Sequence, residues 1–127
     1  YVVDHGNHTI RKITAAGVVT TVAGTAGSAG TVDGRGSAAR FRYPTAITVD
    51  ASGTAFVADT DSQQIRQVTA AGDVTTIGGS ATSGTGSTDG TGTVARFYNP
   101  KGIAVASGGR LLIADRSNHT IRMATPF

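Results

Sequence analysis

The sequence lacks residues on which several classes of protein depend. It has no cysteine, which excludes disulfides, thiolate catalysis and cysteine-ligated zinc. It has no glutamate, and Lys12 and Lys101 are its only lysines, so it has few of the residues that cover exposed helices. Its longest apolar run, of about five residues, is far shorter than the roughly 20 that a membrane-spanning helix needs.

The abundant residues favour strands and turns. The chain of 127 residues contains 18 glycines and is rich in threonine, which fits many short strands joined by turns. The expected fold class is therefore all-β. The net charge of +3 comes mostly from arginine, and this mild excess does not by itself indicate a nucleic-acid partner.

An internal repeat of about 55 residues organises the chain. Asp4, Asp59 and Asp115 each close a run of small and apolar residues, and an Ile-Arg pair follows six residues later at 10–11, 65–66 and 121–122. The isoleucines are expected to be buried at matching places. A second motif, Asp-Gly-x-Gly-x-x-Ala-Arg-Phe, occupies 33–41 and 89–97, and Pro44 and Pro100 follow it.

Each repeat predicts four short strands. Strands a, b, c and d are expected at about 45–50, 54–59, 64–69 and 73–78, with hairpin turns at Ser52-Gly53 and Ala71-Gly72. Four antiparallel strands repeated at a fixed period are typical of the blades of a β-propeller.

Three segments of the last repeat resemble the NHL-repeat family. They are Pro100 to Val105, Leu112 to Asp115 and Asn118 to Arg122, and the long Asp-Gly loop resembles an extended bacterial variety. The resemblance implies a propeller, commonly six-bladed. It leaves function open, because the family includes binding scaffolds, RNA readers and a few lyases or hydrolases. This sequence departs from the Asn-His-Leu tripeptide that gives the family its name, because Thr9 and Thr120 replace the leucine.

The chain holds about two and a half predicted blades. Residues 1–24 are expected to form strands b-c-d, residues 41–79 a complete blade, and residues 97–127 strands a-b-c, while Tyr1–Ala16 repeats Leu112–Phe127. Two explanations remain: the chain is part of a longer propeller, or copies close a ring as a head-to-tail homo-oligomer. A trimer of six blades is favoured, in which the last blade takes strand d from Val18–Ala23 of the next copy.

Residues present in every repeat are expected to maintain the blades. The repeated aspartates are predicted to cap the turn between strands b and c, in preference to binding a metal. Arg40 and Arg96 are predicted to brace the long loops, with Phe41 and Phe97 filling the gaps between blades. The three histidines lack the partners of a zinc site, so no metal or cofactor is expected.

Residues that break the repeat are the candidates for binding. The loops between strands d and a and the turns between b and c should emerge on one face, and Arg and Tyr are common anchors of interfaces. The predicted ligand-binding face consists of His5, Arg35, Arg42, Tyr43, Tyr98, Lys101 and Arg116.

These observations favour a non-catalytic interaction scaffold whose loop face binds a protein, glycan or small anionic ligand. The alternatives are a metal-dependent lyase or hydrolase with its site on the ring axis, or an RNA-binding propeller, against which the scarcity of lysine weighs. The composition suggests an extracellular or cell-surface location, with the cytoplasm as the alternative.

Overall fold

A computed structural model describes residues 1–126, and within them every regular element is a strand or a short 3-10 turn. None of the described residues forms a helix with the length and apolarity needed to traverse a membrane. The first strands are β1 (Val2–Asp4), β2 (Thr9–Ile13), β3 (Val19–Gly24) and the short β4 (Gly34–Arg35). They are followed by β5 (Pro44–Val49), β6 (Ala55–Asp59), β7 (Gln64–Val68), β8 (Asp73–Gly79), β9 (Pro100–Val105), β10 (Leu111–Asp115) and β11 (Thr120–Ala124). The turns are η1 (His5–Asn7), η2 (Gly36–Ala38), η3 (Thr60–Ser62), η4 (Ser107–Gly109) and η5 (Arg116–Asn118).

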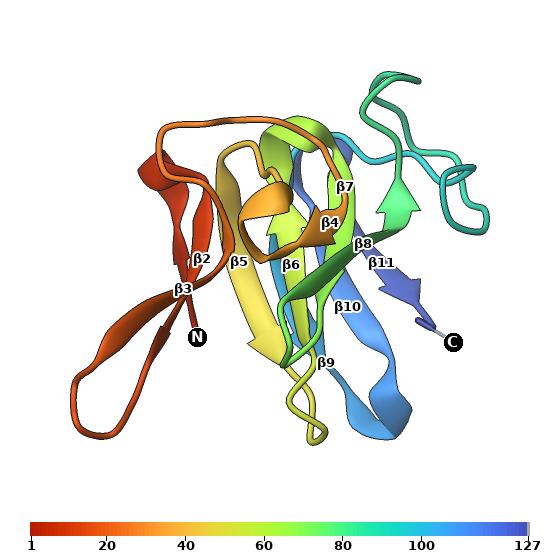
Figure 1. The fold of residues 1–127 in the computed structure, drawn as a ribbon. Helices are drawn as coiled ribbons and strands as arrows, with labels where there is room; N and C mark the ends of the chain where they lie inside the picture. Colours follow the sequence, from red (N-terminus) through yellow and green to blue (C-terminus); the bar gives the residue numbers. More distant parts are fainter. Residues whose placement is uncertain (127) are drawn as a thin grey trace.

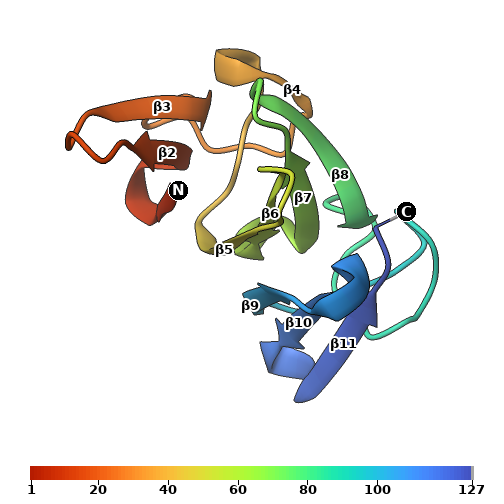
Figure 2. The same cartoon turned by 90° about the horizontal axis from the view of Figure 1, so that it is seen from below.

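The strands form three antiparallel sheets, in the orders β1-β2-β3, β4-β8-β7-β6-β5 and β11-β10-β9. In terms of the repeat, the sheets contain strands b-c-d, strands a-b-c-d with β4 added at the edge, and strands a-b-c. The three sheets stand side by side like the blades of a fan (Figures 1 and 2), with β5 packed beside both β9 and β1. The all-β class and the propeller blades expected from the repeat are confirmed.

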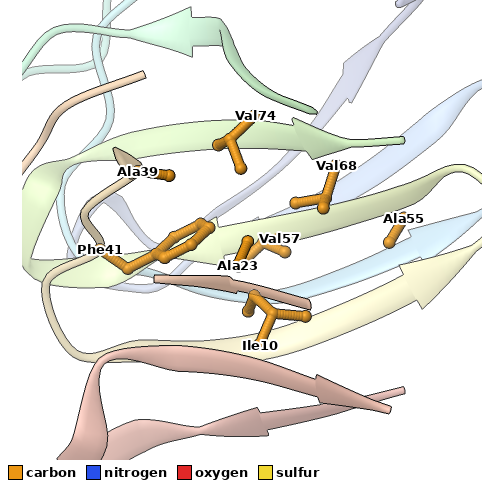
Figure 3. Packing of buried hydrophobic residues seen from close by; sticks show 8 residues of the cluster. All are labelled: Ile10, Ala23, Ala39, Phe41, Ala55, Val57, Val68 and Val74. Atoms are coloured by element: carbon orange, nitrogen blue, oxygen red, sulfur yellow. The ribbon is translucent and has the colours of Figure 1, made fainter. Parts of the chain in front are cut away.

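The hydrophobic core lies between the sheets. Between the first and second blades, eight buried residues pack together (Figure 3), with Phe41 in the gap: Ile10, Ala23, Ala39, Phe41, Ala55, Val57, Val68 and Val74. The second interface repeats this arrangement with Phe97: Phe56, Ile65, Ala95, Phe97, Leu111 and Ile113. The predicted placement of the two phenylalanines is therefore confirmed. Burying each ring stabilises the fold by about 2–3 kcal/mol.

The repeated isoleucines do not share one environment. Ile10 and Ile65 are 0% and 1% exposed, but Ile121 is 72% exposed. Ile10 packs in the same cluster as Phe41, and Ile65 packs in the same cluster as Phe97. Among the described residues, no following blade covers Ile121 in this way. The expectation of matching burial is wrong for the last repeat, because burial here depends on a neighbouring sheet.

The turns and loop ends that carry most of the predicted binding residues lie at one end of the blades. Pro44 at the start of β5 pairs with Asp59 at the end of β6, and Gln64 pairs with Gly79. The η1, η3 and η5 turns therefore lie at the same end as the starts of β5 and β9, at the top in Figure 1. This end is called the upper end below.

Candidate ligand-binding face

A buried arginine joins the long loop to the middle blade. The Arg66 side chain, on β7, has no exposed surface. Its Nη1 donates to Asp59 Oδ2 at 2.9 Å and to the carbonyl of Arg40 at 3.0 Å. Its Nη2 donates to the carbonyl of Val32 at 2.9 Å and to Asp33 Oδ1 at 2.8 Å. The planar fork of arginine suits this set of acceptors, which a lysine would not satisfy.

The same arrangement recurs in the last blade. Arg122 Nη1 donates to Asp115 Oδ2 at 3.0 Å and to the carbonyl of Arg96 at 2.9 Å, while Nη2 reaches Asp89 and the Thr88 carbonyl. Each guanidinium lies over a phenylalanine ring, with 5.1 Å from Cζ to the centroid of Phe41 or Phe97. The Ile-Arg pair is visible in the sequence as a repeat, but the pattern by itself assigns no role to the arginine.

The repeated aspartates hold the loop backbone, which corrects the prediction that they cap their own turns. Asp59 Oδ1 accepts the backbone N–H of Arg42 at 2.8 Å, and Asp115 Oδ1 accepts that of Tyr98 at 2.8 Å. Neither aspartate caps the backbone of its 3-10 turn; the contact of Asp115 with η5 is through a side chain, Asn118 Nδ2, which donates to Oδ2 at 2.7 Å. The carboxylate of Asp4 accepts hydrogen bonds from Asn7 and Arg11, as that of Asp115 does from Asn118 and Arg122.

Burial dominates the electrostatics of Asp59. Its desolvation raises the pKa of the carboxyl to about 6, although the charge of Arg66 and the Arg42 N–H act to lower it. The ion pair with Arg66 therefore only partly offsets the cost of placing this charge away from water.

The predicted braces of the long loops are confirmed. Arg40 Nη1 donates to the carbonyls of Ser37 and Ala39, at 2.7 Å for the latter. Arg96 Nη1 donates in the same way to the carbonyls of Val94 and Ala95, at 3.0 and 2.8 Å.

The first two turns at the upper end each reach toward the following blade. His8 Nδ1 accepts the backbone N–H of Tyr43 at 3.2 Å, and Gln63 Oε1 accepts that of Asn99 at 2.7 Å. His8 and Gln63 adopt left-handed backbone conformations, with φ of 59° and 57°, as does His119 at 57°. These residues close the 3-10 turns, and the side chains of His8 and Gln63 join one blade to the next.

A second position in the same turns also joins the blades. His5 Nδ1 donates to the carbonyl of Pro44 at 3.0 Å, and the hydroxyl of Thr60 donates to that of Pro100 at 2.7 Å. Arg116 is the matching residue of the last blade. His5 and Arg116, chosen because they break the repeat, therefore occupy a position that connects blades.

Six of the seven predicted face residues lie at the upper end. The His5 ring contacts the Tyr43 ring in a tilted arrangement, with 5.2 Å between their centroids. Tyr98 lines a shallow cleft of about 410 Å³ with Arg116, Ser117 and His119. The six exposed residues are His5, Arg42, Tyr43, Tyr98, Lys101 and Arg116.

Arg35 lies at the other end. It pairs with Asp73 at the start of β8, and the adjacent Gly36 N–H donates to the carbonyl of Gly72 in the turn between β7 and β8. Its side chain is 73% exposed and lies 3.8 Å from the Asp73 carboxylate. The long loop descends along β8 before it returns, so the prediction that groups Arg35 with the other residues is wrong.

The upper end has an excess of positive charge. Arg42, Lys101 and Arg116 are exposed there, and Asp61 on η3 is the exposed carboxylate beside them. The side chains of Arg42 and Lys101 form no hydrogen bond with residues 1–126. Within the same residues, no group of three His or Asp side chains has the spacing of a metal site.

The fanned sheets, with their phenylalanine-filled gaps and repeated Asp-Arg contacts, define a segment of a β-propeller. More particularly, residues 97–122, which include the last sheet, match the family model described as NHL repeat. The resemblance inferred from the sequence is thereby confirmed. No curated protein sequence matches the chain.

Solved structures share the fold over nearly the whole chain. An auxiliary nutrient binding protein from Bacteroides thetaiotaomicron is 28% identical, with a TM-score of 0.80, over 95% of this chain and 33% of its own. One from Bacteroides ovatus is 28% identical, with a TM-score of 0.79, over 94% and 32%. A streptogramin B lyase is 16% identical, with a TM-score of 0.65, over 95% and 32%, and this likeness concerns the fold alone. The chain thus spans about a third of the length of these proteins.

Proposed function

We propose that this chain provides part of the ligand-binding face of a propeller and that its upper end binds a carbohydrate bearing carboxylate or sulfate groups. The observation that carries the proposal is the exposure of three cations beside two tyrosines at this end, with the side chains of Arg42 and Lys101 free of partners among residues 1–126. Arginine binds carboxylate and sulfate oxygens in a bidentate manner, and a tyrosine ring offers an apolar face to a sugar.

Two further points support a binding role. The proteins from Bacteroides thetaiotaomicron and Bacteroides ovatus, 28% identical to this chain, are described as auxiliary nutrient binding proteins. In addition, Tyr43 and Asn99 have φ of 47° and 51° and are held by the preceding turns, so the backbone beside Arg42 and Tyr98 is fixed. A preformed backbone lowers the entropic cost of binding.

Titration calorimetry with an oligogalacturonide and the matching neutral oligogalactoside tests the proposal. The acidic sugar is expected to bind, and more weakly as salt rises, because exposed charges are screened. Arg42→Ala or Lys101→Ala should each weaken binding by roughly five- to tenfold, the effect of one charged hydrogen bond. Arg35→Ala is the matched control, since Arg35 lies at the other end. Equal binding of the neutral sugar, or an equal loss in the control, would contradict the proposal.

A further inference from the structure

The two junctions between blades use different side chains for the same hydrogen bond at the upper end. At the first junction, His8 Nδ1 accepts the backbone N–H of Tyr43 at 3.2 Å, and at the second, Gln63 Oε1 accepts that of Asn99 at 2.7 Å. Tyr43 and Asn99 come directly before β5 and β9, and both have left-handed backbones, with φ of 47° and 51°. Such a conformation is uncommon outside glycine and is held by its surroundings. Each accepted N–H therefore fixes the start of a strand a.

The bond at the first junction requires a neutral imidazole. An N–H can donate to Nδ1 only where that nitrogen carries no proton, so the proton of the His8 ring lies on Nε2. A second proton would turn Nδ1 into a donor that faces the N–H donor of Tyr43. The side-chain oxygen of Gln63 has no such alternative state, because a carboxamide does not titrate at ordinary pH. The bond at the first junction therefore depends on protonation, and the bond at the second does not.

The His8 ring is enclosed at this contact. The residue is 6% exposed, and its ring meets that of Tyr43 edge-on, with 4.4 Å between centroids and 81° between planes. Burying a charged group that has lost its hydrogen bond is costly. Separation of η1 from the start of β5 relieves this cost, because it returns the charged ring to water.

His5, in the same turn, makes a bond of the opposite kind. Its Nδ1 donates to the carbonyl of Pro44 at 3.0 Å, and a protonated ring keeps this donor. The His5 ring lies 5.2 Å from that of Tyr43, centroid to centroid. Protonation of both histidines brings two like charges to the same tyrosine, but the bond that acid removes is the one made by His8.

The charged groups near the first junction do not supply a new acceptor for His8. The titratable and charged residues around it, on its own blade and on the following one, are Asp4, His5, Arg11, Arg42, Tyr43 and Asp59. The Asp4 carboxylate is bonded by Asn7 and Arg11, and Asp59 Oδ1 is bonded by the backbone of Arg42. Within residues 1–126, the hydrogen bond of the His8 side chain is the one with Tyr43. A protonated His8 in the closed junction is therefore left without a carboxylate partner.

We propose that the first junction is sensitive to acid: protonation of His8 releases Tyr43 and the start of β5, whereas the second junction, held by Gln63, stays closed. The open form binds the proton and the closed form does not, so closure is lost as pH falls. Arg42 directly precedes Tyr43, so the part of the upper end that carries Arg42 loosens in acid. This response does not depend on which ligand the upper end binds.

Amide hydrogen exchange in the parent chain tests the proposal within one molecule. The neutral fraction of an ordinary exposed imidazole falls roughly tenfold between pH 7.5 and pH 5.5. The protection factor of the Tyr43 N–H, its rate of exchange compared with that of an unstructured peptide at the same pH, should therefore fall by up to about tenfold. The protection factor of the Asn99 N–H should stay constant. Equal falls at the two amides, or constant protection at both, would overturn the proposal.

Exchanging the two side chains supplies a second measurement. His8 and Gln63 have nearly the same backbone, with φ of 59° and 57°, so each position can accept the other's residue. His8→Gln should make the protection of Tyr43 independent of pH, and Gln63→His should transfer the acid response to Asn99. His5→Gln is the matched control, because it removes an imidazole from the same turn and should leave the response of Tyr43 in place. An equal loss of the response in His5→Gln and His8→Gln would contradict the assignment to the Nδ1 bond.

Discussion

Arg66 and Asp59 form an ion pair from which water is excluded: Nη1 lies 2.9 Å from Oδ2, and neither side chain has exposed surface. The counterpart in the first blade, Arg11 with Asp4, lies at 3.1 Å with side chains 32% and 30% exposed. The difference follows from the long loop, because residues 32–40 cover Arg66 and supply two carbonyls and Asp33 to it. The chain thus contains the same ion pair in a buried and a half-exposed form.

Arg66→Met should reduce the free energy of unfolding by about 3–5 kcal/mol, because it leaves Asp59 charged and unpaired in the core. Arg11→Met is the matched control and should cost at most about 1 kcal/mol, as is usual for exposed pairs. Urea denaturation of the two variants and the parent chain measures both values. Similar losses would show that burial by the long loop does not determine the strength of the pair.

The Asp59 carboxyl predicts a pH dependence of stability. Its pKa in the folded chain is about 6, above the unfolded value of 3.8, so the folded state holds this proton more tightly. The contribution to stability is therefore greatest below about pH 4 and is lost as pH rises to about 6, by at most about 3 kcal/mol. Denaturation of the parent and Asp59→Asn chains between pH 4 and 7 tests this. The difference in their unfolding free energies should change across that window, and a constant difference would exclude the raised pKa.

Substitutions of Arg40 and Arg42 distinguish a residue that braces the long loop from a residue on the exposed face. Arg40→Ala should lower the unfolding free energy by about 1–2 kcal/mol, since it removes hydrogen bonds to two loop carbonyls. Arg42→Ala should change it by less than about 0.5 kcal/mol, because its side chain is exposed and only its backbone bonds Asp59. Thermal melts of the two variants provide the comparison, and equal losses would refute the division between them.

Gly79 at the end of β8 should not tolerate a side chain. Its φ is +83°, and a Cβ there would lie 2.1 Å from the carbonyl oxygen of Gln63. Gly79→Ala is expected to cost more than about 2 kcal/mol, from both backbone strain and displacement of the turn. Gly84→Ala, at φ +77° with open space around it, is the control and should show the backbone cost alone. Denaturant unfolding of both variants would reveal a difference if the close approach matters.

The repeat made the strands predictable, because strand bounds depend on the local pattern and on the turns that flank it. The predicted strand c at about 64–69, for example, is Gln64–Val68 in the structure. The burial of individual residues was harder to predict from the sequence, because Ile121 has the same sequence context as Ile65 and differs only in what covers it. Periodicity describes a blade and does not show whether another blade follows.

The site was predictable only in part, for a related reason. The position of Arg42 and Tyr98 at the upper end follows from strand direction, which the repeat supplies. The position of Arg35 depends on how the long loop folds against β8, through contacts with Gly72 and Asp73 that no local pattern encodes. The acceptors of Arg66 lie up to 34 residues away in the chain, but its occurrence in every repeat was a usable signal.

The junction between blades can be tested at His8. Its ring is 6% exposed and accepts the N–H of Tyr43, whereas the His119 ring has no hydrogen bond to residues 1–126. Both residues have a left-handed backbone, with φ of 59° and 57°, so an alanine meets the same backbone cost at either position. His8→Ala should therefore destabilise the chain by about 1–2 kcal/mol more than His119→Ala, the cost of one unsatisfied donor at the junction. His8→Gln should recover most of that difference, because Gln63 makes the matching bond at 2.7 Å. Urea denaturation compares the three variants. Equal losses in His8→Ala and His119→Ala would mean that the turn conformation, rather than the bond to the next blade, determines which residues this position accepts.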